Sequence, residues 1–326
     1  MFVRATSRLR VLGVATTAFA APLAALSAFS ACSGDPKPSG PPPLVLTDED
    51  VAKRDVKPID PPDTALPPPP DSGGPTGTIY VQTGVSLQVY DPYSKALKNI
   101  GKYACLPDSD FVFDIAVDRD NNVYAVTAED RFLKVDPLSG ACTVIRQGAG
   151  LDYPLLIAFV PRGSLDAAND ALVGFDGELY LRIDLRTGGV TSVGELNPPD
   201  AGNRYAAIGD LIFAGKNGMF LTATPEFDAG AADAGDTFIR FDPKTGRRLA
   251  IVGTTGGYRN LYGLGYWGGS IFAFTTPGEI LKVSPTNAAT TLVKRIDGGP
   301  PKEGGAPEAV FFGAGSTTVA PETPAL

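Results

Sequence analysis

Short segments in which apolar and polar residues alternate recur along most of the chain, and each runs into a turn. One example is Phe132-Leu133-Lys134-Val135, which is followed by Asp136-Pro137-Leu138-Ser139-Gly140. Alternation with a period of two is typical of a β-strand with one buried face. In such a turn the acid accepts backbone hydrogen bonds, proline fixes φ and glycine takes a positive φ. The pattern therefore predicts a series of strand–turn–strand units.

Five copies of this turn follow one another at the interval of a repeat architecture. The spacing between the first residues of successive turns is 45, 48, 58 and 42 residues. Repeats of about this length with four strands each are typical of β-propeller blades. The five turns begin at Asp91, Asp136, Asp184, Asp242 and Ser284. We therefore expect an all-β fold, a propeller of four-stranded blades.

Ring closure can be predicted from the strand that each blade places nearest the axis. Four copies have a strand of small residues at that point, such as Ile115-Ala116-Val117, because the blades converge there. The first copy lacks one, since proline-rich sequence precedes it, but Glu308-Ala309-Val310-Phe311-Phe312 offers a match. This segment would complete the first blade and remove the free edges of the ring. We expect five blades, with six as an alternative because the 58-residue interval contains extra chain.

The periodicity and the Asp-Pro-x-Thr-Gly turns of residues 77–313 resemble those of bacterial YVTN- and NHL-like propeller proteins. The N-terminal sequence, described next, suggests a lipid-anchored, extracytoplasmic form of such a protein. The resemblance implies the architecture. It does not imply one activity, because propellers of this kind include binding scaffolds and a minority of enzymes.

The N-terminus has the layout of a bacterial lipoprotein signal peptide over residues 1–31. Arginines precede an apolar run from Val11 to Ala31, and Cys32 follows. The tetrad Phe29-Ser30-Ala31-Cys32 resembles a lipobox, although that family usually has leucine where Phe29 stands. We expect Cys32 to be acylated. Cleavage without acylation, or an uncleaved membrane anchor, are the alternatives.

Residues 32–76 are predicted to be a disordered tether, because this stretch is rich in proline and poor in large apolar residues. Its length would hold a folded domain at residues 77–313 away from a membrane. Residues 314–326 are expected to form a disordered tail. The predicted location is the outer membrane or the cell surface, with a periplasm-facing orientation as an alternative.

Cysteine usage agrees with export. Acylation of Cys32 would leave Cys105 and Cys142 as an even pair in an oxidising compartment. Both lie near strand ends in adjacent repeats, which favours a disulfide. Two separate buried thiols are the alternative.

The amino-acid composition excludes several classes of catalytic site and metal site. The chain has no histidine, which excludes Ser-His-Asp and Cys-His nucleophiles, histidine-bound zinc and facial-triad iron. The net charge is −8, and loss of residues 1–31, which carry three arginines and no acids, lowers it to −11. A protein this acidic has no electrostatic reason to bind nucleic acid or anionic lipid. Chemistry based on carboxylates, including calcium binding, remains open.

Two acidic segments are candidate calcium loops. Asp118-Arg119-Asp120-Asn121-Asn122 has Glu129 at the twelfth position, as an EF-hand does, but Val123 stands where that loop needs glycine. We therefore predict a hairpin turn there. The second segment, 225–236, is predicted to be a flexible insertion. No cofactor is expected, and calcium is the alternative.

Candidate ligand-binding residues come from the segments that enter the innermost strands, since these should cluster at one end of the axis. Their aromatic and charged side chains would suit a sugar or a peptide segment. The alternative is that the tyrosines pack between blades and the charges are solvated. The candidates are Asp110, Asp152, Tyr153, Arg204, Tyr205, Arg259, Asn260, Tyr262, Trp267 and Glu308.

The leading functional hypothesis is a membrane-anchored module that binds a protein or glycan. The alternative is a carboxylate- or calcium-dependent hydrolase or lyase, with Asp110, Asp152 and Glu308 as acid and base and Arg204 or Arg259 stabilising negative charge. Propeller lactonases resemble such a site, with calcium held by residues such as Glu308, Asn260 and Asp110. Zinc-dependent cyclotransferases would need ligands that this chain lacks. A structural envelope protein is a third hypothesis.

Overall fold

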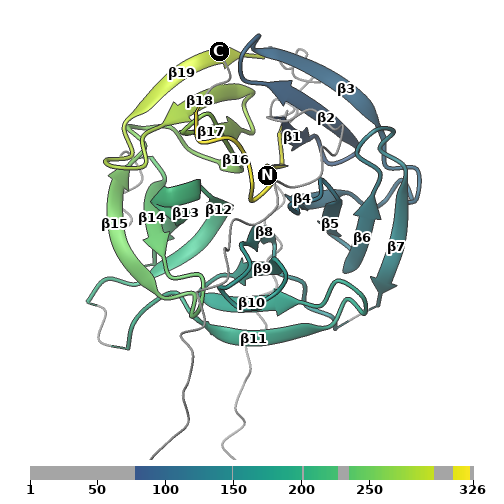
Figure 1. The fold of residues 1–326 in the computed structure, drawn as a ribbon, viewed down its shortest axis with the longest axis horizontal. Coiled ribbons are helices and arrows are strands. Elements are labelled where there is room, and N and C mark those ends of the chain that lie inside the picture. The colour runs from purple at the N-terminus through teal and green to yellow at the C-terminus, as the bar shows by residue number, and fades with distance from the viewer. Residues whose placement is uncertain (1–77, 149, 200–201, 227–234, 297–310, 324–326) are drawn as a thin grey trace, which may run out of the picture. The chain divides into compact units, whose positions relative to one another are not determined.

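The computed structural model describes residues 78–148, 150–199, 202–226, 235–296 and 311–323. The predicted signal peptide and tether lie outside these residues, as do Cys32 and Glu308. The described part is a ring of five four-stranded antiparallel sheets, a five-bladed β-propeller (Figure 1). It contains no α-helix, only the 3₁₀ turn η1 (Gly215–Asn217), and within these ranges no helix is long and apolar enough to cross a membrane. The all-β, five-bladed prediction is confirmed.

The strands of each blade follow one another from the axis to the rim. Blade 1 consists of β20 (Gly313–Gly315), β1 (Ile79–Gln82), β2 (Ser86–Asp91) and β3 (Ala96–Lys102). Blade 2 consists of β4 (Val112–Val117), β5 (Val123–Thr127), β6 (Arg131–Val135) and β7 (Cys142–Gln147). Blade 3 consists of β8 (Leu156–Val160), β9 (Ala171–Asp176), β10 (Leu179–Ile183) and β11 (Val190–Glu195). Blade 4 consists of β12 (Tyr205–Phe213), β13 (Met219–Pro225), β14 (Thr237–Phe241) and β15 (Arg248–Thr254). Blade 5 consists of β16 (Leu261–Trp267), β17 (Ser270–Thr275), β18 (Glu279–Val283) and β19 (Thr290–Arg295).

The hydrophobic core lies between the blades. Five clusters of buried apolar side chains occur, and each joins two neighbouring blades, so that every interface of the ring has one. At the interface of blades 5 and 1, the ring of Tyr90 meets that of Phe274 edge-on at 5.4 Å. Because no blade can bury its faces alone, each depends on its two neighbours.

The ring closes through β20, which pairs with β1 in the register Val81↔Ala314. The C-terminal origin of this strand was predicted correctly, but its position at Glu308–Phe312 was not. The strand is instead the small-residue segment Gly313–Gly315 that follows. A Cβ atom on Gly313 would lie 2.4 Å from Oδ1 of Asp114. Only small residues fit this close to the axis, so the phenylalanines stay outside the strand.

Residues 316–323, which were expected to belong to a disordered tail, pack across the ring. We call this segment the strap. It bonds to β16 and to the connections between the first and second strands of blades 3, 4 and 5, at the end of the axis opposite the entries to the innermost strands. The bonds join Ser316 to Tyr266, Thr318 to Asp170, Pro321 to Gly268 and Glu322 to Lys216.

The repeated acid-led turns join the third and fourth strands of a blade and also make contacts between neighbouring blades. Three of them lie against the outermost strand of the blade before, where a glycine of β3, β11 or β15 makes room for the turn. A Cβ atom on Gly101 would lie 1.9 Å from the carbonyl oxygen of Ser139, and one on Gly194 would lie 2.1 Å from that of Thr245. The turn therefore contributes to packing between blades and also closes its own hairpin.

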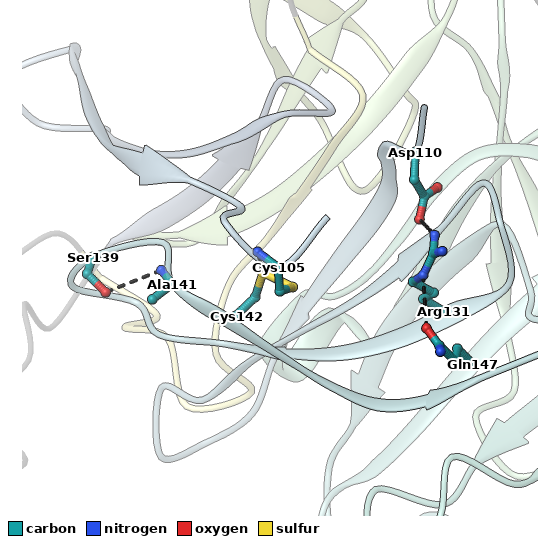
Figure 2. The surroundings of a disulfide bond; sticks show 7 residues. All are labelled: Cys105, Asp110, Arg131, Ser139, Ala141, Cys142 and Gln147. Carbon is teal, nitrogen blue, oxygen red and sulfur yellow. Dashed lines mark hydrogen bonds and ion pairs between the residues drawn. A yellow bond between two sulfur atoms is a disulfide. The ribbon is translucent and has the colours of Figure 1, made fainter. Parts of the chain in front are cut away.

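A disulfide strengthens the contact between blades 1 and 2. Cys105, which follows β3, is bonded to Cys142, the first residue of β7, with 5.4 Å between the two Cα atoms (Figure 2). The predicted pairing is confirmed. It links the exit from blade 1 to the outermost strand of blade 2 covalently.

Two C-terminal truncations should separate the roles of β20 and the strap. Ending the chain at residue 310 removes both, which should abolish the single cooperative unfolding transition because β1 loses its partner and blade 1 its innermost strand. Ending it at residue 316 keeps β20 and removes the bonds of Thr318, Pro321 and Glu322. We expect this chain to unfold in one transition, about 3–10 °C lower. Calorimetry of the two chains and the full one is the measurement, and identical transitions in all three would contradict the closure.

Candidate functional site

One end of the axis gathers most of the predicted site residues, and we call this end the mouth. It is formed by the segments that enter each innermost strand and by the hairpins between the second and third strands of each blade. Of the ten candidates, Glu308 lies outside the described residues and Trp267 does not lie at the mouth. Trp267 is the last residue of β16, whereas Tyr262 is near its start. The five steps along the strand from Tyr262 to Trp267 place them about 16 Å apart.

Asp110 is committed to the structure of blade 2. Its side chain is fully buried and accepts hydrogen bonds from the backbone N–H of Phe111 at 2.9 Å and of Glu129 at 3.0 Å. Its second oxygen forms an ion pair with Arg131, whose Nε donates to Gln147 at 3.2 Å (Figure 2). Asp110 thus fixes the β5–β6 hairpin against the entry to β4, and the predicted catalytic acid has no free oxygen at the surface.

Arg204 connects blades 3 and 4. It forms an ion pair with Glu178 of the β9–β10 hairpin, and a second, at 3.3 Å, with Glu226 after β13. Glu178 also accepts a hydrogen bond at 2.9 Å from the buried amide of Asn197. The guanidinium is about one third exposed, so the network lies at the surface of the mouth.

Tyr153 and Tyr205 belong to the core, as the alternative interpretation predicted. Tyr153 is 5% exposed and donates its hydroxyl to the carbonyl of Gly188 at 2.8 Å. Burial raises its pKa to about 12. Tyr205 is 7% exposed, and the Arg248 guanidinium lies 5.0 Å from its ring centre.

The exposed candidates are Asp152, Arg259 and Asn260, all of which lie in loops before an innermost strand. Asp152 and Asn260 have positive φ values of 43° and 58°. Next to Asn260, buried Asp236 accepts the N–H of Leu261 at 3.0 Å, and burial raises the pKa of this acid. These loops present polar groups on fixed turns.

The predicted EF-hand alternative fails on geometry. Asp118 accepts hydrogen bonds from the N–H groups of Asp120 at 2.9 Å and Asn122 at 2.8 Å, which closes the β4–β5 hairpin. Glu129 lies beyond β5 and pairs with Arg131 at 3.0 Å. Among the described residues, no group of three or more cysteine or acidic side chains could hold a metal ion. Residues 227–234 of the second acidic segment lie outside the description.

An apolar patch at the mouth was not predicted. Phe111, Phe113 and Phe312 have partly exposed rings, with centres 5.0 Å apart for the first pair and 5.8 Å for Phe111 and Phe312. Val85, in the neighbouring β1–β2 loop, is 58% exposed. The clue in the sequence was the density of phenylalanine at the entries to two innermost strands.

Two further acids lie on the axis itself and were also missed. Asp114 of β4 and Asp210 of β12 are 1% and 0% exposed, and a side-chain hydrogen bond joins their carboxyl groups. Asp114 also accepts the N–H of Ile157 in blade 3 at 2.7 Å, and Asp210 that of Leu264 in blade 5. The pair therefore links blades 2 to 5 at their centre. The clue was an acid inside an otherwise apolar innermost strand.

This axial pair holds a proton that free aspartic acids would lose. Removal from water raises the pKa of both acids, and the charge of Asp114 raises that of Asp210 further. A hydrogen bond between two carboxyl groups needs one proton, so the two acids share one. Backbone N–H groups occupy all four oxygens, so the pair is structural rather than open to a substrate.

Comparison with known proteins finds only distant similarity to solved structures. No protein-family profile matches the chain, and no curated protein sequence does. Among solved structures, the Dos1 propeller is 12% identical with a TM-score of 0.33, over 69% of this chain and 57% of that one. A structural genomics protein of unknown function from Bacteroides thetaiotaomicron is 15% identical with a TM-score of 0.40, over 67% and 55%. BamB from Moraxella catarrhalis is 12% identical with a TM-score of 0.31, over 67% and 69%. The chain thus spans little more than half the length of the first two.

The axial pair should make the ring more stable in mild acid. An aspartate whose pKa is raised on folding adds stability that is fully present below its unfolded pKa of about 3.9, and loses it as the pH rises through the folded pKa. In that range the contribution falls by up to about 1.4 kcal/mol per pH unit. In the Asp210→Asn variant the side chain at this position cannot titrate. It also loses one hydrogen bond from a backbone N–H group, because an amide nitrogen cannot accept a hydrogen bond. We expect its deficit in melting temperature to be larger at pH 5 than at pH 8. Asp152→Asn is the exposed control, and an equal deficit at both pH values would contradict the shared proton.

Proposed function

We propose that this chain is a membrane-tethered, extracytoplasmic binding module that presents the mouth of its propeller to a protein or a glycan. The observation that carries the proposal is the contrast between the two kinds of side chain at the mouth. Buried acids such as Asp110 are occupied by structural bonds, whereas the apolar and polar groups at the surface are held on rigid turns. A fixed surface of this kind suits recognition, because little conformational freedom is lost on binding.

The hydrolase alternative finds less support in the arrangement. A general acid or base must reach the substrate within hydrogen-bond distance. Asp110 is buried beneath Arg131, whereas Asp152 lies in the loop that enters a different blade. The axial acids are enclosed. The described carboxylates therefore offer no pair placed for catalysis.

The Cys105–Cys142 disulfide supports an extracytoplasmic location, because such bonds persist in oxidising compartments. The signal-like sequence that ends at Cys32 supports a lipid anchor, and the proline-rich stretch after it suits a tether. In this arrangement the ring would stand clear of the lipid surface and be reachable by a partner.

The lipid anchor can be tested by fractionation. Cys32→Ser removes the only thiol available for acylation at the end of the apolar segment, so we expect the protein to leave the membrane fraction. Ser33→Ala, one residue further, is the matched control and should stay with the membrane. Unchanged fractionation of Cys32→Ser, together with no lipid on the wild-type protein by mass spectrometry, would contradict anchoring.

The binding role can be tested by photo-crosslinking in cells. A photoreactive phenylalanine analogue at Asp152 or Asn260 samples the mouth, and the same group at Tyr93 or Leu138 samples exposed turns at the opposite end. We expect one reproducible adduct, to protein or to cell-wall glycan, from the mouth positions alone. Equal labelling from all four positions, or none from the mouth, would contradict the proposal.

A further inference from the structure

The apolar patch at the mouth, formed by Val85, Phe111, Phe113 and Phe312, is built from three separate segments. Val85 lies in the β1–β2 loop, and the phenylalanines lie at the starts of β4 and β20. Gly84 lies between them, since a Cβ atom there would be 3.6 Å from both Phe111 and Phe312. The patch thus covers the junction of blades 1 and 2.

A buried glutamine fixes the patch in place. Gln82, which is 0% exposed, accepts a hydrogen bond from the N–H of Gly84 and donates to the carbonyl of Phe113 at 2.9 Å. The loop is bonded again where Val112 donates to Gly84 at 2.8 Å. These bonds tie the β1–β2 loop to β4, so the patch is organised before any partner arrives, which lowers the cost of binding.

A β-bulge explains why a phenylalanine of an innermost strand reaches the surface. In β4, Val112 pairs with Thr127 and Asp114 pairs with Val126, which leaves Phe113 as an extra residue between them. Val112 and Asp114 are buried, whereas Phe113 is partly exposed. Bulges re-aim side chains in this way and are frequent beside functional sites.

The charges around the patch are predominantly negative. Ala128 donates to the carbonyl of Phe111 at 2.9 Å, which places the β5–β6 hairpin beside the patch. The hairpin and the entry to β4 carry more acids than bases, and the one arginine is paired with two of the acids. The charged residues of these two segments are Asp108, Asp110, Glu129, Asp130 and Arg131, and one further cation, Lys102, pairs with Ser86 beside Val85.

The phenylalanine rings favour an apolar anchor over a sugar. Phe111 packs on Phe113 with an interplanar angle of 66° and on Phe312 with one of 53°. The three rings therefore form no flat platform, and none has a hydroxyl for hydrogen bonding. Aromatic clusters of this kind, surrounded by polar residues, are typical anchors of protein interfaces.

We propose that this patch docks a polypeptide segment in which an apolar side chain is flanked by lysine or arginine. The apolar side chain would lie on Val85 and the phenylalanines, and the cations would face Asp108 in the entry to β4 and Glu129 of the adjoining β5–β6 hairpin. This inference rests on the proposed binding function, and it names the chemical class of the partner.

The test uses the full mature chain in detergent and a short fluorescein-labelled peptide that alternates lysine with leucine and phenylalanine. Fluorescence anisotropy should show binding that weakens with added salt. A peptide with glutamate in place of lysine, and one with serine in place of the apolar residues, should bind at least about tenfold more weakly.

Variants locate the site. Phe113→Ala should weaken binding about tenfold or more, and Val85→Ser about threefold. Leu138→Ser is the matched control, since Leu138 is 79% exposed in the β6–β7 turn, and it should bind as the wild type does. Asp108→Asn should weaken binding of the basic peptide and make that binding less dependent on salt. Asp120→Asn lies in the β4–β5 turn at the opposite end and should change neither property. If Phe113→Ala lowers the melting temperature, the Val85→Ser variant, at an exposed position, decides whether the patch binds the peptide.

Three results would overturn the inference. The first is equal binding of the basic and acidic peptides, and the second is an equal effect of Val85→Ser and Leu138→Ser. The third is failure of the peptide to bind, combined with another interaction at the same patch. That interaction would be binding of soluble peptidoglycan fragments or self-association of the chain, and the Val85→Ser variant would lose it. Mouth-specific crosslinks from Asp152 would then still support the binding function with another ligand. Their absence would instead remove the binding function itself.

Discussion

The antiparallel pairing of β20 with β1 is the interaction on which the rest of the structure depends. A blade in this ring buries its faces only against its neighbours, because each of the five apolar clusters spans an interface. An open arc would leave two blade faces and a strand edge in water. Three small residues, Gly313, Ala314 and Gly315, complete the circle and hold the mouth in one shape.

Closure at such a narrow axis has an electrostatic consequence. The innermost strands approach so closely that Asp114 and Asp210 meet out of water, and only a shared proton makes this tolerable. In return, the two carboxyl groups accept backbone N–H groups from blades 3 and 5. The centre of the ring is therefore polar, with its hydrogen bonds satisfied, and the axial acids are closed to a ligand.

The repeat could be predicted from the sequence because each turn carries its own local chemistry, from Asp91 to Ser284. The disulfide followed from parity and strand position. What could not be predicted depends on packing between blades. The closing strand was placed at Glu308–Phe312 as a match to the other innermost strands, whereas the space at the axis selects the glycines that follow. Tyr153 and Asp110 looked available because sequence does not reveal that Gly188 and Arg131 occupy them.

The position of β20 also affects how the chain matures. Synthesis begins at the N-terminus, so β1 leaves the ribosome long before the segment that pairs with it. During this interval the edge of β1 is unprotected and able to pair with another chain. Folding therefore finishes only after the C-terminal residues have been synthesised, when β20 protects this edge and the strap fastens the completed ring.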